Sequence, residues 1–283
     1  MKRNCIFVKI QIKEQEGDNV AFLNYEYKMI ISYSEPVDKC YFTIKSIPVD
    51  DFRQRSISYE INMSPNTSYS ESRDSFGNSQ IIGSVARAHS KYEYVIKGLV
   101  ETNIAGITGG VNTAKVGMYK YPYGKCIPGE TIKEFAKNIS EEVNKCTSTK
   151  DKCLKIMGLI NERMIYEKGH TNVETCAEEA FAGKKGVCQD YAHIFITLLR
   201  LFKIPARYVC GLIVGEGESH AWVEAAIEGN YVAFDPTHNI EITDEYIKFG
   251  AGRDATDCAI NRGVMWGGGA QTQEVNVVVD KYY

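Results

Sequence analysis

Hydrophobic positions recur with helical spacing after Cys188. Four apolar residues follow it at alternating steps of four and three: Ala192, Phe195, Leu199 and Phe202. This spacing is typical of one face of an α-helix. The helix is expected to end before Pro205, because proline cannot continue a helix and disfavours helical backbone in the residue before it. The pattern therefore places the Cys188 thiol at the first turn, facing the core.

Runs of β-branched and aromatic residues predict three strands after this helix. Residues 206–214 form the first, and Gly215–Gly217 are expected to break it. Residues 220–227 then pair with residues 231–235 through a turn at Glu228-Gly229-Asn230.

The centre of that turn sets which residues face each other. A turn centred between Glu228 and Gly229 places Trp222 opposite Asp235. His220 and Asp235 then lie on one face as diagonal neighbours, roughly 7–8 Å apart at the backbone. A slip of one residue would put them on opposite faces, so the register decides whether they can meet.

The first hundred residues are rich in strand patterns. Extended runs occur at residues 7–12, 25–34, 41–44, 56–63 and 92–100. Turn residues separate them: Gly17-Asp18, Ser34-Glu35-Pro36 and Phe76-Gly77-Asn78. These features predict a small all-β, sandwich-like domain over residues 1–120. Residues 102–129 are interpreted as the junction, where Tyr119, Tyr121 and Tyr123 pack at the domain boundary rather than line a ligand groove.

Helical patterns follow over residues 131–183. Thr131–Glu134 and Thr175–Glu178 have the spacing of capping boxes and predict helices that end near Lys145 and Gly183. A further helix is expected over residues 151–166. Glycines at 263 and 267–269 indicate a mobile loop near the cleft, and residues 275–279 a strand that rejoins the catalytic sheet. Residues 121–283 are thus expected to form one α+β catalytic domain.

Composition limits the partners and the compartment. The chain has 283 residues and a formal net charge of −3, which argues against nucleic acid or an anionic membrane as the main partner. Its nine cysteines show no paired-cysteine spacing and indicate free thiols. We find neither a secretory signal nor a membrane-spanning run and expect a cytoplasmic protein. No cofactor is expected, and the oligomeric state is left open.

The order of a thiol, a histidine and a carboxylate indicates nucleophilic chemistry. The first turn of a helix favours a thiolate at Cys188 through unpaired N–H groups and the helix dipole, and Gly186 allows close backbone approach. A carboxylate at Asp235 can fix the tautomer of His220 and leave its other nitrogen for the thiol. Each of these residues alone is more often structural.

Several segments resemble the bacterial transglutaminase-like superfamily, whose core is similar to that of papain-type peptidases. They are GVCQDYAH, SHAWVEA and FDPTHN, with TCAEEAF, Gly252-Arg253-Asp254, Arg262-Gly263 and Asp74–Asn78 as further elements. The resemblance implies a papain/transglutaminase-like catalytic domain after a β-rich N-terminal region. It also implies that Cys188 is the nucleophile, His220 the base and Asp235 its orienting partner.

These residues predict a cysteine-dependent enzyme that cleaves an amide bond of a peptide or protein through a thioester. The Cys188 N–H and a second donor would hold the oxyanion; Gln189, Trp222, Gly186 and the Tyr119–Tyr123 segment are the candidates. Hydrolysis is favoured, because Trp222 is expected to shield the site and Trp266 sits in the glycine-rich loop.

Three alternatives remain at this point. A transglutaminase would use the same residues with an amine acceptor, and a non-catalytic binding module could keep the fold. A metal site of Cys188, His220 and His238 is disfavoured, because no ligands at metal-site spacing accompany them.

Overall fold

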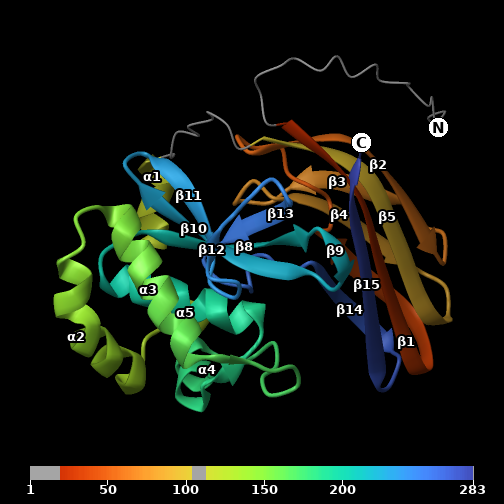
Figure 1. The fold of residues 1–283 in the computed structure, drawn as a ribbon. Helices are drawn as coiled ribbons and strands as arrows, with labels where there is room; N and C mark the ends of the chain where they lie inside the picture. Colours follow the sequence, from red (N-terminus) through yellow and green to blue (C-terminus); the bar gives the residue numbers. More distant parts are fainter. Residues whose placement is uncertain (1–19, 104–112, 283) are drawn as a thin grey trace.

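The computed structural model describes residues 20–103 and 113–282 (Figure 1). It contains an eight-stranded sheet and a five-stranded sheet, with a two-stranded pair near the helices. Figure 1 shows the helices at one end, the larger sheet at the other and the five-stranded sheet between them. The fold is thus mixed, with a strand-rich N-terminal part before the helices, as predicted. The expected strand at 7–12 and the turn at Gly17-Asp18 lie outside the described residues.

The larger sheet is built around one long strand, β1 (Val20–Ile44). Its other strands are β2 (Gln54–Ser64), β3 (Tyr69–Arg73), β4 (Ser79–Val85), β5 (His89–Asn103), β9 (Gly215–Gly217), β14 (Asn261–Gly267) and β15 (Gln271–Tyr282). Alternate residues of β1 face the core, among them Leu23, Tyr25 and Tyr27. The period of two is that of a strand with one buried face.

Strand β1 changes partners along its length. The first part of β1 pairs with β5 and β15, and its last part pairs with β4 and β14. The register of β1 shifts between Ser32 and Val37 where partners change. The predicted turn at Ser34-Glu35-Pro36 is therefore wrong: these residues form an irregularity within one strand, because pairing resumes at Val37 with β5 and β14.

The C-terminal segment belongs to the larger sheet. β15 pairs with β1 from Phe22↔Tyr282 to Tyr33↔Gln271, so the expectation that residues 275–279 rejoin the catalytic sheet is wrong. Gly215–Gly217, expected as a break, form β9 on β15. The predicted glycine-rich loop is the strand β14 and its connection to β15, where Gly267–Gly269 have positive φ. Trp266 packs edge-on against Tyr41 there.

The five-stranded sheet carries the predicted hairpin. Its strands are β8 (Ala206–Ile213), β10 (His220–Ile227), β11 (Asn230–Asp235), β12 (Ile240–Glu241) and β13 (Tyr246–Gly252), in the order β12-β11-β10-β8-β13. Val223 pairs with Phe234 and Ile227 with Asn230, which confirms the predicted register. Glu228 and Gly229 both have positive φ, as a tight hairpin turn requires.

The helices are α1 (Thr113–Val116), α2 (Glu130–Asn144), α3 (Thr149–Arg163), α4 (Ala177–Gly183) and α5 (Cys188–Leu201), with the short 3-10 turns η1 (Gly117–Tyr119) and η2 (Gly124–Cys126). Helices α3 and α5 pack against the five-stranded sheet, and α2 and α4 lie beside them at the same end of the molecule (Figure 1). The predicted start of α5 at Cys188 is confirmed. Ala192, Phe195 and Leu199 are fully buried, as their spacing indicated.

Two predicted capping boxes are wrong in detail. Helix α2 has no side-chain cap of its own; the carboxylate of Glu178 accepts hydrogen bonds from the backbone N–H groups of Gly129, Thr131 and Ile132. The capping partner at the start of α4 is instead Glu179, which accepts from the Cys176 N–H. Glu178 is free to cap α2 because the box of α4 lies one residue later than expected.

Side chains of the larger sheet hold strand β13. The Asn78 amide donates to the Ala251 carbonyl at 3.0 Å and accepts from the Ala251 N–H at 2.8 Å. Gln54 makes the same pair of bonds to Lys248, at 2.8 and 2.7 Å. The two sheets are therefore joined by backbone-directed bonds, and a boundary at residue 120 stays a prediction.

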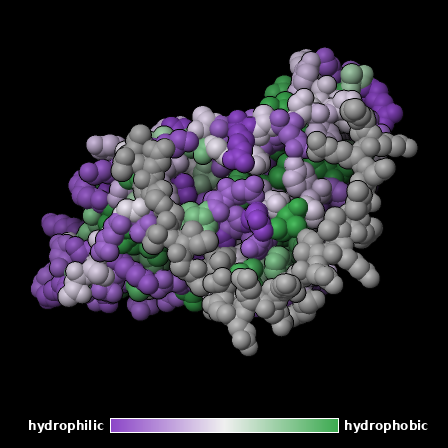
Figure 2. Space-filling view, turned by 90° about the horizontal axis from the view of Figure 1, so that it is seen from above, coloured by the Kyte–Doolittle hydropathy of each residue, from purple (hydrophilic) through white to green (hydrophobic). Residues whose placement is uncertain are grey.

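Surface character varies along the molecule. In Figure 2 the helical end is mostly hydrophilic, with smaller hydrophobic patches between. Within residues 20–103 and 113–282, no helix has the length and apolarity needed to span a membrane.

Candidate active site

Cys188 is the first residue of α5, and its loop is braced by Asp190. The buried Asp190 carboxylate accepts hydrogen bonds from the Val187 N–H at 2.8 Å and the Thr171 hydroxyl at 2.6 Å. A Cβ on Gly186 would lie 2.5 Å from this carboxylate, so the glycine lets the loop close over it. The thiol itself is partly exposed.

His220 and Asp235 meet as the register predicted. His220 begins β10 and Asp235 ends β11, and both are buried. His220 Nε2 lies 2.7 Å from Asp235 Oδ2. This contact leaves Nδ1 as the ring nitrogen for the thiol of Cys188, whose charge acts on the imidazole.

The electrostatics of the pair favour a charged imidazole. Burial alone would lower the pKa of His220, but hydrogen bonds to Asp235 and Cys188 and their negative charges raise it to about 10. Burial alone would raise the pKa of Asp235, but hydrogen bonds from His220, His238 and Tyr246, with the charge of His220, hold it well below its usual range. The site therefore stabilises an imidazolium between a carboxylate and a thiol.

Asp235 has two further side-chain partners that the sequence did not reveal. Asp235 Oδ2 accepts from His238 Nδ1 at 2.6 Å and from the Tyr246 hydroxyl at 2.8 Å. Asp235 Oδ1 accepts from the backbone of Thr237. The spacing of His238 in FDPTHN was a usable signal, whereas Tyr246 comes from β13 and has none. The carboxylate is thus fixed from several directions.

His220, Asp235 and His238 are residue types that bind metal ions, but the distances between their ligand atoms do not fit a metal site. Ligand atoms of His220, Asp235 and His238 all lie within 4.8 Å of one another. Two ligands of one tetrahedral zinc ion, each ~2.0 Å from it, would be roughly 3.3 Å apart. The contacts of Asp235 to the two imidazoles, 2.7 and 2.6 Å, are shorter and are hydrogen bonds.

The predicted oxyanion candidates lie in different places. Trp222 is 2% exposed and stacks on His220, so it forms a wall behind the imidazole. Gln189 follows Cys188 and is partly exposed. The Tyr119 carbonyl accepts from Arg200, which lies about 18 Å along α5 from Cys188 at 1.5 Å per residue. The structure therefore separates the Tyr119 end of its segment from the thiol.

The surroundings of Cys188 contain residues that the sequence did not indicate. Tyr166 lies in β6 (Ile165–Tyr166), which pairs with β7 (Lys185–Gly186) so that Tyr166 faces Gly186. Lys168, two residues after Tyr166, forms an ion pair of 3.2 Å with Glu218, which lies two residues before His220. The charge of Cys188 acts on both Tyr166 and Lys168.

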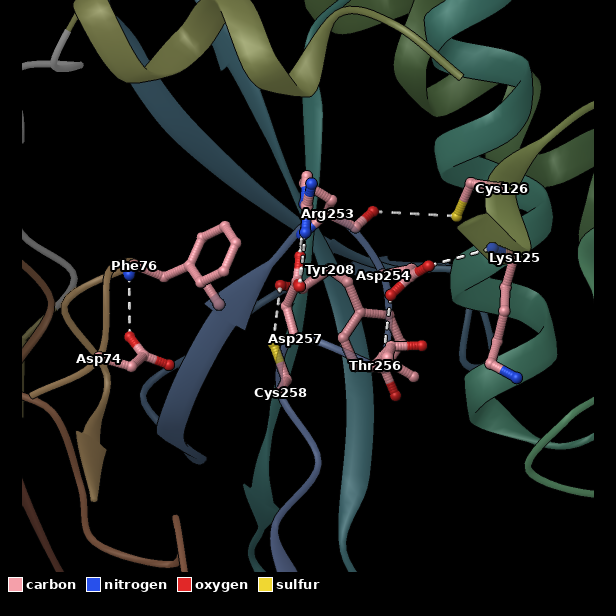
Figure 3. Close-up of polar contacts among 12 residues, drawn as sticks. Asp74, Phe76, Lys125, Cys126, Tyr208, Arg253, Asp254, Thr256, Asp257 and Cys258 are labelled. Atoms are coloured by element: carbon pink, nitrogen blue, oxygen red, sulfur yellow. Dashed lines mark hydrogen bonds and ion pairs between the residues drawn. The ribbon is translucent and has the colours of Figure 1, made fainter. Parts of the chain in front are cut away.

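The Gly252-Arg253-Asp254 element contacts the end of α5 that is far from Cys188 (Figure 3). Asp254 accepts from the Lys125 and Thr256 N–H groups, and the Arg253 guanidinium pairs with Asp257. The Arg253 carbonyl accepts from Arg200 at 2.7 Å. These contacts hold the far half of α5 and give the element a structural role.

Known proteins show the same organisation. Residues 135–236 match the transglutaminase-like superfamily, and residues 23–101 match the bacterial transglutaminase-like N-terminal region. The crystal structure of a proposed cysteine protease from Cytophaga hutchinsonii superposes with a TM-score of 0.76 at 22% identity, over 93% of this chain and 91% of that one. At this identity the likeness shows the fold.

Curated relatives come from mycobacteria. An uncharacterised protein of Mycobacterium leprae is 40% identical over 129 residues, 42% of this chain, and the match spans only 46% of that relative. An uncharacterised protein of Mycobacterium tuberculosis is 24% identical over 282 residues, 88% of this chain and 87% of the relative. The two family matches show that the chain carries a bacterial transglutaminase-like N-terminal region followed by a core of the transglutaminase-like superfamily.

Proposed function

We propose that this protein is a cysteine-dependent acyl-transfer enzyme that cleaves an amide bond of a peptide or protein through a thioester. The observation that carries the proposal is the His220 imidazole, which lies 2.7 Å from the carboxylate of buried Asp235 and interacts electrostatically with the thiol of Cys188. Such a sequence of contacts is what an activated nucleophile requires.

The proposed reaction proceeds in two halves. The Cys188 thiolate attacks the carbonyl carbon, a C–S bond forms, and the π electrons of the carbonyl move to its oxygen. The tetrahedral intermediate collapses with loss of the amine, which takes its proton from the His220 imidazolium. An acceptor then attacks the thioester while neutral His220 removes its proton, and the thiolate leaves.

The surroundings of the thiol favour water as the acceptor. An amine competes with water only where a water-poor channel with apolar and aromatic walls binds it. The two tryptophans do not provide such walls: Trp222 is buried behind His220, and Trp266 lies in β14 of the larger sheet. Hydrolysis is thus the proposed main outcome, with transfer to an amine as the competing one.

Selective alkylation tests the activated thiol. Iodoacetamide at neutral pH should modify Cys188 first, which intact mass and peptide mapping will show. Cys146 and Cys176 are also partly exposed and serve as internal controls, whereas burial raises the pKa of Cys126 and of Cys153 to about 12. Equal rates at Cys188, Cys146 and Cys176 would contradict the proposal.

A competition experiment tests the acceptor. A peptide substrate is supplied with millimolar lysine-type amine, and the hydrolysed and amine-linked products are compared by mass. We expect mostly hydrolysed product from the wild type and none of either from Cys188→Ala. Mostly amine-linked product would favour a transglutaminase, and no turnover together with an unreactive Cys188 would favour a binding module.

A further inference from the structure

Tyr166 is fixed beside the nucleophile by its backbone. The residues on both sides of it are held: the Ile165 N–H donates to the Lys184 carbonyl at 2.9 Å, and the Glu167 N–H donates to the Gly186 carbonyl at 3.0 Å. Gly186 is two residues before Cys188. The position of Tyr166 relative to the start of α5 is therefore set by the strand pair β6–β7.

The ring of Tyr166 lies at the first turn of α5. Its centroid is 6.5 Å from that of Tyr191. Tyr191 is three residues after Cys188, so the two share one face of the helix. Burial, then the negative charge of Cys188, raises the pKa of Tyr166, which keeps its hydroxyl protonated and able to donate.

The Tyr166 side chain is also accessible to a substrate. Tyr166 is 48% exposed, whereas Trp222 is 2% exposed and Tyr119 is at the other end of α5. Within residues 20–103 and 113–282, the Tyr166 hydroxyl has no hydrogen-bond partner. A protonated hydroxyl without a hydrogen-bond partner, on a ring held at the first turn of α5, can donate a second hydrogen bond to the oxygen of a substrate carbonyl.

We propose that the Tyr166 hydroxyl donates the second hydrogen bond to the oxyanion that forms when Cys188 attacks a carbonyl, the first coming from the Cys188 backbone N–H. The inference rests on the proposed acyl-transfer function. When the carbonyl π electrons move to oxygen, the negative charge is received by these two donors. When the intermediate collapses, that electron pair re-forms the carbonyl, and neither donor loses its proton.

Two probes of Cys188 separate this role from a structural one. Iodoacetamide is attacked at a saturated carbon and forms no oxyanion, so its rate reports only the thiolate. The ester p-nitrophenyl acetate is attacked at a carbonyl and passes through an oxyanion. Acylation is followed by nitrophenolate release and by the mass gain of one acetyl group on Cys188.

The variant Tyr166→Phe removes the hydroxyl and keeps the ring. We expect alkylation of Cys188 within about 2-fold of wild type and acetylation slower by about 100-fold, the size seen when one oxyanion donor is lost. Tyr282→Phe, at 49% exposure on β15, and Tyr191→Phe, which alters the neighbouring ring, should leave both rates near wild type.

Each other outcome has a clear meaning. An unchanged acetylation rate in Tyr166→Phe would overturn the assignment. Equal loss of both rates would also overturn it, since Tyr166 would then act on the thiol. A wild type that is alkylated at Cys188 but never acetylated would contradict the acyl-transfer function itself, and the inference about Tyr166 would fall with it.

Discussion

Replacing Asp235 by asparagine tests the charge arrangement of the site. Asp235 has no solvent exposure and accepts hydrogen bonds from His220, His238 and Tyr246 on one oxygen. Asparagine keeps the shape but removes the negative charge, and its NH₂ group would face donors. His220 would lose the partner that stabilises its imidazolium form.

The expected effect follows from the pKa of His220. Asp235 and Cys188 raise it to about 10 against burial. Relative to an ordinary histidine near 6.5, this is about 5 kcal/mol in favour of the imidazolium. Cys188 supplies part of this free energy. We therefore expect Asp235→Asn to slow Cys188 alkylation at pH 6 by roughly 10²–10³-fold and to move the midpoint of the alkylation pH profile toward the pKa of a free thiol, ~8.5.

The assay is a pH series of iodoacetamide alkylation, with circular dichroism to confirm folding. Asp254→Asn is the matched control: Asp254 is also buried, but among the described residues its carboxylate accepts only from backbone N–H groups, those of Lys125 and Thr256. It should follow the wild-type profile. If Asp235→Asn gave the wild-type profile as well, the imidazolium would not depend on the carboxylate and the reasoning would be refuted.

Three further changes test other parts of the structure. Glu178→Ala should lower the free energy of unfolding in urea by about 1–2 kcal/mol, because three N–H groups at the start of α2 lose their acceptor, whereas exposed Glu130→Ala should not. Burial lowers the pKa of His193 to about 3. Below pH ~6.5 the unfolded chain therefore binds a proton at His193 that the folded protein does not, so the folded state loses stability as the pH falls. The wild type should lose about 2 kcal/mol more than His193→Asn between pH 7.5 and 5, measured by urea unfolding; equal losses would contradict this. Glu218→Ala removes an exposed ion pair with Lys168 and should change KM at low salt only, since salt screens such pairs.

Local patterns in the sequence were enough for the centre of the site. The period of α5 located Cys188, and the turn at Glu228-Gly229 fixed the register that brings His220 to Asp235. Both signals are short-range: a helix period and a hairpin turn depend on residues close in sequence. Register then determines the face of every side chain in the hairpin.

Long-range contacts could not be predicted in this way. Tyr246 reaches Asp235 from β13, and Glu178 caps a helix that begins 48 residues earlier, at Glu130. The strand pattern of residues 275–279 was recognised, yet its partner β1 was not, because a period of two predicts a strand without naming the sheet that it joins. The turn residues at Ser34-Glu35-Pro36 gave a wrong prediction for a related reason: strand pairing before and after them, at Tyr33 and Val37, overrode their local preference.

Strand β13 links the larger sheet to the candidate site. Strand β13 supplies Tyr246 to Asp235, and the same strand is bound along its length by Gln54 and Asn78 of the larger sheet. Each of those amides satisfies a backbone N–H and a backbone carbonyl, so a shift of β13 would leave buried polar groups unpaired. The N-terminal region therefore constrains the site through the strand that positions Tyr246, although none of its described residues contacts His220 or Asp235 in a hydrogen bond. This gives the β-rich region a physical reason to accompany the core in one chain: it fixes the edge strand from which the carboxylate receives its third side-chain donor.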